Sequence, residues 1–254
     1  MTTKPIYVLA LGLLSLTLSG CGNSGKTEEY KPKVQEKVTP VTIAPGQEAD
    51  LFPIKADNKW VYEGETTQTT PQGTRTTKSE VTFRVAEVAD TADGKVATIE
   101  VTADGALSDR MKWRIGPTGI YQVAGSQRAS KDGPLKESKF EPAIPIVPFP
   151  VKAGSELIAT STGIRPGAGV GPFQSKTVVE GIQEVDTDMG RFSALSTSSE
   201  SIYKEKGVSF RSATGVFWTP KVGIVRYLQE IVATNAEGKT ISSNSVLRLK
   251  SHTP

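Results

Sequence analysis

Apolar and polar residues alternate along most of the chain beyond residue 50, which is the period-2 pattern of half-buried β-strands. Val81, Phe83 and Val85 occupy alternate positions in one such run, and the run from Asp109 to Ile115 alternates strictly. No stretch of helical length carries an apolar stripe at a 3.6-residue period. The pattern therefore predicts an all-β fold.

Turn signals separate these runs at roughly the 8–12-residue spacing that is typical of an all-β sandwich or barrel. Ala92-Asp93-Gly94, Ala103-Asp104-Gly105 and Asp186–Gly190 are three of them. We predict ten or eleven strands in an antiparallel, largely up-and-down meander. The sheet would curl into a barrel, a half-barrel or a sandwich.

Two segments interrupt this rhythm. Four prolines lie between Pro142 and Pro150, and because proline cannot donate to a regular ladder we expect an edge strand or a crossing strap there. Gly163–Gly171 is expected to form a flexible loop, with a lid over a cavity as the alternative.

The N-terminal segment has a different pattern. Lys4 precedes an apolar run from Ile6 to Leu18, whose thirteen residues fall short of the ~20 that a membrane-spanning helix needs. A basic start, an apolar run and small residues indicate a secretory signal peptide. Gly20–Thr27 also fits the phosphate-binding pattern GxxxxGK[ST], but Pro32 would break the helix that such a loop requires.

Leu18-Ser19-Gly20-Cys21 resembles the lipobox of bacterial lipoproteins. The resemblance implies cleavage before Cys21, a diacylglycerol thioether on its sulfur, and acylation of the new N-terminus by a chain such as palmitate. The expected organisation is a signal peptide (1–20), a lipidated Cys with a flexible tether (21–50), and one all-β domain (51–254).

The resemblance also implies a location. The protein would be anchored by lipid to the cell membrane or the outer membrane, facing the periplasm or the exterior. In lipoproteins of two-membrane bacteria, the absence of Asp after the lipidated Cys favours the outer membrane, and Gly22 occupies that position. The tether is rich in Lys, Glu, Thr and Pro, a composition typical of disorder.

A second resemblance concerns both ends of the domain. Leu51–Lys55 with Trp60-Val61-Tyr62, and the stretch Phe217–Val225, are similar to segments of uncharacterised all-β envelope lipoproteins. Some of these resemble in shape the half-barrel carriers of the LolA and LppX kind. Such carriers usually close the half-barrel with helices, which this sequence does not predict.

Composition excludes several classes of function. The net charge of +3 falls to +2 when the segment bearing Lys4 is removed, so we expect no nucleic-acid partner. The single Cys leaves no disulfide. With one His and no cysteine cluster, zinc and copper sites are not expected, and Asp186 with Asp188 fits a hairpin turn better than a calcium loop.

Catalytic patterns are also missing. His252 lies third from the end in a tail that is expected to fray, so it makes a poor general base. Ser201 and Lys204 match S-x-x-K, but a strand would place them on opposite faces. We therefore predict no catalytic residue, no cofactor and no metal, and a protein that is not an enzyme.

Two groups of residues could contact a ligand or partner. The first is a basic row on the outward face of one strand, which could meet phosphate head groups or anionic glycans, or could simply be a solvated face: Arg110, Lys112 and Arg114. The second comprises aromatic residues that could line an apolar cavity or form the core: Trp60, Trp113 and Trp218.

The sequence leaves two functional hypotheses. In the first, the chain is a non-enzymatic envelope lipoprotein that acts as a structural or protein-interaction module with a filled core. In the second, it carries a lipid or another apolar molecule, which predicts an interior too large for its own side chains.

Overall fold

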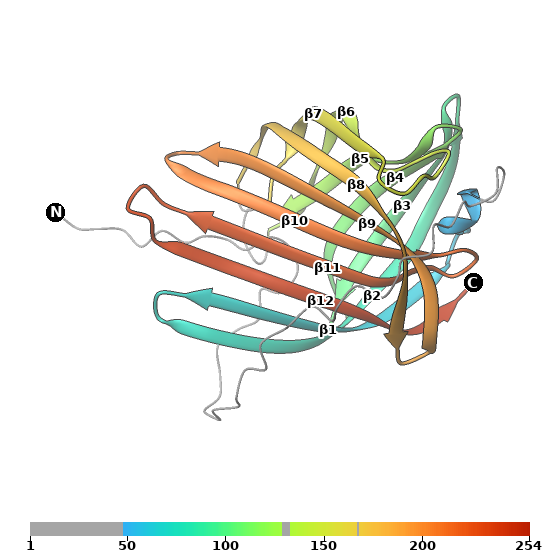
Figure 1. Ribbon diagram of the computed structural model, residues 1–254, viewed down its shortest axis with the longest axis horizontal. Helices are drawn as coiled ribbons and strands as arrows, with labels where there is room; N and C mark the ends of the chain where they lie inside the picture. The colour runs from blue at the N-terminus through green and yellow to red at the C-terminus, as the bar shows by residue number, and fades with distance from the viewer. Residues whose placement is uncertain (1–47, 129–132, 167) are drawn as a thin grey trace.

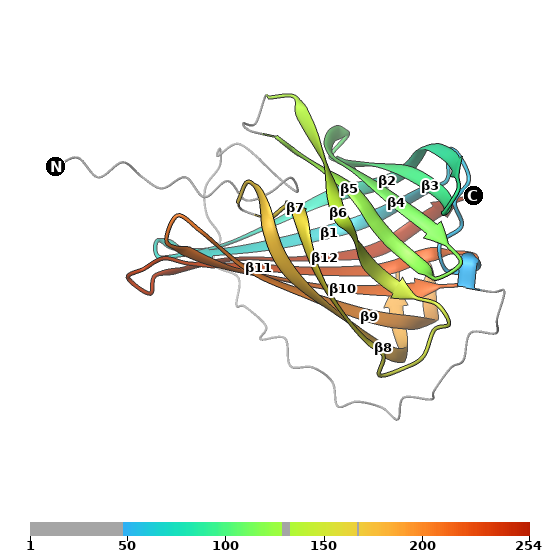
Figure 2. The ribbon, with the colours of Figure 1, turned by 90° about the horizontal axis from the view of Figure 1, so that it is seen from above.

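The computed structural model describes residues 48–254 apart from 129–132 and 167. The predicted signal peptide, Cys21 and nearly all of the tether lie outside the described residues. Twelve antiparallel strands form a closed barrel, as Figures 1 and 2 show. A short 3₁₀ turn, η1 (Glu48–Leu51), precedes them.

The strands follow one another along the chain, and their bounds are β1 (Lys59–Thr70), β2 (Gly73–Thr91), β3 (Gly94–Ala103), β4 (Ala106–Gly116), β5 (Gly119–Arg128), β6 (Leu135–Pro148), β7 (Glu156–Ile164), β8 (Val170–Thr187), β9 (Gly190–Glu205), β10 (Val208–Thr219), β11 (Gly223–Thr234) and β12 (Thr240–Thr253). Each strand pairs with its neighbours in sequence, and β12 pairs with β1 to close the ring. The prediction of an antiparallel meander is confirmed, and its form is a closed barrel. In the described part of the chain, no helix is long and apolar enough to cross a membrane.

The additional strand is β6, which contains the predicted strap. It pairs with β5 from Gly119–Pro148 to Arg128–Leu135, so it belongs to the barrel wall. Its prolines nevertheless limit the other edge, where β6 pairs with β7 only at Glu141–Thr162 among the described residues. The expectation of an edge-like strand was therefore right about the hydrogen bonding and wrong about the placement.

The main apolar core fills one end of the barrel. Phe52, which follows η1, enters this end, and its ring centroid lies 5.1 Å from that of Trp60 and 4.9 Å from that of Trp113. η1 and the C-terminus lie at this same end (Figure 1). A second, smaller apolar cluster lies around the inward side chains of Phe140, Phe173, Tyr203 and Phe210. This arrangement leaves the middle of the barrel between two apolar regions.

The C-terminal residues differ from the prediction. β12 continues to Thr253, and His252 lies opposite Trp60 with the two rings stacked at 5.3 Å. The expected frayed tail was wrong, because pairing with β1 and stacking on a buried indole hold these residues in place. Burial lowers the pKa of His252, which favours the neutral imidazole.

Candidate functional site

Two rows of polar side chains run around the inside of the barrel between the apolar clusters. Each row takes one inward residue from each of six adjacent strands, β8 to β12 and then β1. The first row is Thr177, Ser199, Thr214, Gln229, Ser245 and Thr66. The second row is Ser175, Ser201, Ser212, Ile231, Ser243 and Gln68. We call these the polar rows.

Strand periodicity explains why these residues face inward. Along β10, Phe210, Ser212, Thr214 and Val216 alternate with outward residues, and the same side of the strand carries the buried Trp218. The register then carries this inward face from strand to strand, so small hydroxyl side chains line up where a core would normally place large apolar ones.

Some hydroxyl groups of the polar rows form hydrogen bonds with one another within the barrel wall. The hydroxyls of Thr66 and Ser245 lie 2.9 Å apart, and those of Thr177 and Ser199 lie 3.0 Å apart. Ser199, Ser201 and other members are only half-buried although they face inward. The remaining members are buried: Thr66, Ser175, Thr177, Ser212 and Ser245.

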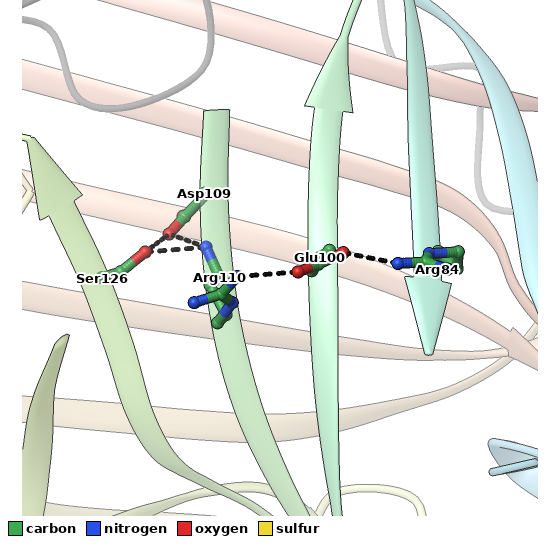
Figure 3. A network of polar contacts seen from close by, with 5 residues as sticks. All are labelled: Arg84, Glu100, Asp109, Arg110 and Ser126. Atoms are coloured by element: carbon green, nitrogen blue, oxygen red, sulfur yellow. Dashed lines mark hydrogen bonds and ion pairs between the residues drawn. The ribbon is translucent and has the colours of Figure 1, made fainter. Parts of the chain in front are cut away.

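A buried carboxyl group extends the polar interior to the opposite wall. Asp109 on β4 accepts hydrogen bonds from the Ser126 hydroxyl (2.7 Å) and the Arg110 backbone N–H (2.6 Å), as Figure 3 shows. Burial raises the pKa of Asp109 to about 6, and these hydrogen bonds offset part of that rise. A carboxyl group with this pKa is mostly ionised at neutral pH and becomes protonated in mild acid.

Tyr227 on β11 faces this group across the barrel. Its ring lies 6.4 Å from that of Phe83 on β2, although β1 and β12 separate the two strands around the wall. Burial raises the pKa of Tyr227 to about 12, a hydrogen bond with Thr214 opposes the rise, and the charge of Asp109 adds to it. Tyr227 thus stays neutral, bonds to Thr214 of the first polar row, and lies close enough to Asp109 to be affected by its charge.

The Ser79 hydroxyl adds a potential hydrogen-bonding group. Ser79 pairs with Gly64, one inward position from Thr66 and Thr77, and its oxygen is buried without a partner among the described residues. Buried polar atoms in folded proteins normally have a partner. A bound molecule with hydroxyl groups could supply it.

The basic row predicted on β4 faces outward and is neutralised by neighbouring acids. Arg110 pairs with Glu100 at 2.7 Å, Lys112 with Glu137 at 2.8 Å, and Arg114 with Asp93 at 3.2 Å. Glu100 also binds Arg84 on β2, so the ion pairs continue across three strands (Figure 3). The row lies where predicted, but its positive charges already have partners.

The three tryptophans lie together in the main core. Trp60 and Trp218 are fully buried, and Trp113 is nearly so. Trp218 donates its indole N–H to Thr197 at 3.0 Å and Trp60 donates to the Val222 carbonyl, whereas the Trp113 nitrogen is buried without a partner in the described part of the chain. In this arrangement, all three rings pack against Phe52, and Trp113 also packs against Trp218.

The geometry gives little support to the Ser201 and Lys204 pair or to a metal site. Ser201 faces inward and Lys204 is exposed on the outside of β9, as the strand prediction required. Among the residues that the structure describes, no group of three or more His, Cys, Asp or Glu side chains could hold a metal ion. The interior offers hydroxyl, amide, phenol and carboxyl groups, which suit reversible hydrogen bonding.

Sequence reasoning missed the polar rows and Asp109. The signal was present in strands whose alternate inward positions are small and polar, such as those within Ser196–Ser201 and Ser242–Ser245. A strand of this kind has no apolar face to mark its inner side. The neighbouring strands were needed to assign it.

Comparisons with known proteins do not assign a family. No family model matches the chain, and no curated protein matches it. A solved Bacteroides fragilis protein, described as exported and as having a YMCC-like fold, is 13% identical with a TM-score of 0.42. A Parabacteroides distasonis protein described as a lipoprotein is 11% identical with a TM-score of 0.41. Each match covers 80% of this chain and 98% of the other, and at these values the likeness carries no inference about function.

Proposed function

We propose that this chain is a lipid-anchored protein of the bacterial cell envelope whose barrel binds an uncharged, hydroxyl-rich ligand without transforming it. The observation that carries the binding role is the pair of polar rows. Eleven of their twelve positions are Ser, Thr or Gln, and they face the barrel interior between two apolar clusters.

The lining favours a polar, uncharged ligand. Ser and Thr hydroxyls both donate and accept hydrogen bonds, as the hydroxyl groups of a sugar do. An apolar ligand would cover these groups without pairing them, at a cost of about 1–3 kcal/mol for each group left unsatisfied. An anion would be repelled by Asp109. A neutral glycan fits this chemistry, whether free or as the head group of a glycolipid.

The anchoring role rests on the sequence from Leu18 to Cys21 and on the tether-like composition that follows. Acylation at two positions on one residue would give firm attachment, whereas a single chain binds membranes only marginally. Gly22 favours the outer membrane where the host has one. The barrel would then be held at the membrane surface and exposed to ligands in the envelope.

Anchoring is tested with the full-length chain expressed in a two-membrane bacterium. Cys21→Ser should abolish the diacylglyceryl modification and release the protein from the membrane fraction, while the control Ser24→Ala should behave like the parent. The mass of the N-terminal peptide measures the modification. A parent protein whose Cys21 is unmodified would contradict the proposal.

Binding is tested by calorimetric titration with neutral oligosaccharides, a glycolipid and a fatty acid. Ser201 and Ser212 lie opposite each other in the second polar row, so Ser201→Ala with Ser212→Ala should weaken sugar binding about tenfold or more. Ser209→Ala alters the same strand on its exposed face and should leave binding unchanged. Binding of the fatty acid alone would support an apolar carrier instead, and binding of none would favour a protein-interaction module.

A further inference from the structure

The junction between β6 and β7 differs from every other junction of the described barrel. Adjacent strands elsewhere pair over six to thirteen residues, whereas β6 and β7 pair only at Glu141–Thr162 among the described residues. The two strands nevertheless lie next to each other in both views (Figures 1 and 2). We call this junction the β6–β7 seam.

Prolines explain the weak pairing. Pro142, Pro145 and Pro148 remove backbone donors from β6. Side chains supply bonds in their place, because Ser161 donates to the Pro142 carbonyl at 2.7 Å and Thr177 donates to the Pro145 carbonyl at 2.9 Å. Such side-chain bonds contribute about 1 kcal/mol each, so the seam costs far less to separate than a full ladder.

The seam leads directly to the proposed binding site. Thr177, which bonds to β6, is also a member of the first polar row and bonds to Ser199. From the inside, the Phe140 ring covers the seam and lies against Gly163, where a β-carbon would collide with it. An aromatic side chain can rotate away, whereas a backbone ladder must break.

One end of the seam is held in place. In the β6–β7 connection, the Phe149 N–H donates to the Thr118 carbonyl at 3.0 Å and the Gly154 N–H donates to the Val179 carbonyl at 2.7 Å. Beyond the other end of β7, Arg165 binds the Lys204 carbonyl and the Glu205 carboxylate. These bonds attach β7 to the β8–β9 side, so separation would occur between β6 and β7.

We propose that the β6–β7 seam is a lateral entrance through which ligand reaches the polar rows. The inference rests on the proposed binding function for its purpose, but the opening itself can be measured without any ligand. The strands would part around Phe140 while the connection at 149–155 acts as the hinge. Entry would then require a local separation of two strands and leave the other junctions intact.

The test uses the full-length protein with Ser201→Cys as an interior reporter and a maleimide-linked trisaccharide as the probe. Glu141→Cys with Thr162→Cys joins directly opposed, exposed residues and locks the seam by a disulfide. The matched control, Ser209→Cys with Thr234→Cys, places a disulfide across the fully paired β10–β11 junction. Peptide mass spectrometry measures labelling at residue 201.

Locking the seam should slow labelling by about tenfold or more, and reduction should restore the rate, whereas the control disulfide should have no effect. Equal labelling with the seam locked and open would overturn the proposal, because ligand would then enter elsewhere. So would a reporter that N-ethylmaleimide labels but the larger probe never reaches. Sugar binding at equilibrium, measured separately, can fail while the seam opens, so the two proposals are distinguishable.

Hydrogen exchange on the parent chain tests the seam without any substitution. It therefore decides the proposal even if the cysteine variants fold poorly. Amides of β7 should exchange faster than those of β9, which pairs with β8 over thirteen residues and also with β10. Equal protection of β7 and β9 would also overturn the proposal.

Discussion

Asp109 shows how one residue responds to the interior of a barrel. Its carboxyl group accepts hydrogen bonds from the Ser126 hydroxyl and the Arg110 N–H, while the Arg110 side chain points outward to Glu100. Removal from water therefore dominates, and the pKa of Asp109 rises to about 6. At neutral pH, the protein retains a buried charge that it does not neutralise locally.

This charge makes stability depend on pH. The pKa of Asp109 is raised from 3.8 to about 6, so between these pH values the native state keeps a proton that the unfolded state releases. The contribution to the free energy of unfolding is therefore largest below pH 4 and is lost as pH rises through 6, by about 2–3 kcal/mol. Asp109→Asn should stabilise the protein at pH 7 and have little effect at pH 4. Urea unfolding of both proteins across this pH range measures the free energy of unfolding. Equal stabilisation by Asp109→Asn at pH 4 and pH 7 would contradict the raised pKa of Asp109.

Position 163 requires glycine because the Phe140 ring occupies the place of a β-carbon. Gly163→Ala would push a β-carbon into Phe140 and should lower the free energy of unfolding by about 1–3 kcal/mol. Gly169→Ala is the control, since a β-carbon there meets nothing within 4 Å. Thermal unfolding measures both. In a Phe140→Ala background the cost of Gly163→Ala should fall, and additive effects would show that the two residues do not interact.

Among the elements, the connection between β7 and β8 is held in place at its described residues, 165, 166, 168 and 169. Arg165 is 6% exposed, donates to the Gly169 and Lys204 carbonyls, pairs with Glu205 at 2.6 Å, and lies over the Tyr203 ring. The Tyr203 hydroxyl donates to the Pro166 carbonyl. These contacts hold three residues of the predicted flexible loop against β9: Arg165, Pro166 and Gly169.

Arg165→Met should therefore destabilise the protein by about 2–3 kcal/mol, because it removes a partly buried ion pair together with two bonds to carbonyls. Lys78→Met removes an exposed ion pair with Glu63 and should change stability by less than about 1 kcal/mol. Chemical denaturation compares the two. Equal small effects would show that the loop does not depend on Arg165.

The elements that the sequence predicted best are those with one apolar face. β2 and β4 were recognised because Val81, Phe83, Trp113 and Ile115 mark the inner side, and all four are buried. β6 was predicted to be an edge strand or a crossing strap, because its prolines argue against a central strand, whereas its pairing with β5 tolerates them. Tertiary pairing, which the local sequence does not contain, decided its place.

For the whole molecule, Phe52 closes one end of the barrel. Its ring contacts those of Trp60, Trp113 and Trp218, which come from three separate parts of the wall. Phe52→Ala should cost about 3–5 kcal/mol and shift tryptophan fluorescence to longer wavelength. Ile202→Ala, at a residue that is 59% exposed, should change stability by about 0.5 kcal/mol or less. Unchanged fluorescence in the Phe52 variant would contradict the role of Phe52 in closing this end of the barrel.

The candidate site is a property of the whole molecule, which is why the sequence did not reveal it. Single hydroxyl residues such as Ser201 or Thr214 look like ordinary polar positions. They become a continuous lining only when six strands adopt one register, and the charge of Asp109 acts on Tyr227 only when the ring closes. The tryptophans, by contrast, were visible at once, because large aromatic residues are conspicuous in any sequence.

Closure of the barrel also means that the wall has no natural first strand. Lys59 at the start of β1 lies opposite Thr253 near the end of β12, and short turns connect nearly all of the other neighbours. A circular permutation could therefore join β12 to η1 through a short linker and open the chain within residues 149–155. The new ends would fall at the seam, where strand pairing already contributes least, so such a rearranged gene should still encode the same closed wall.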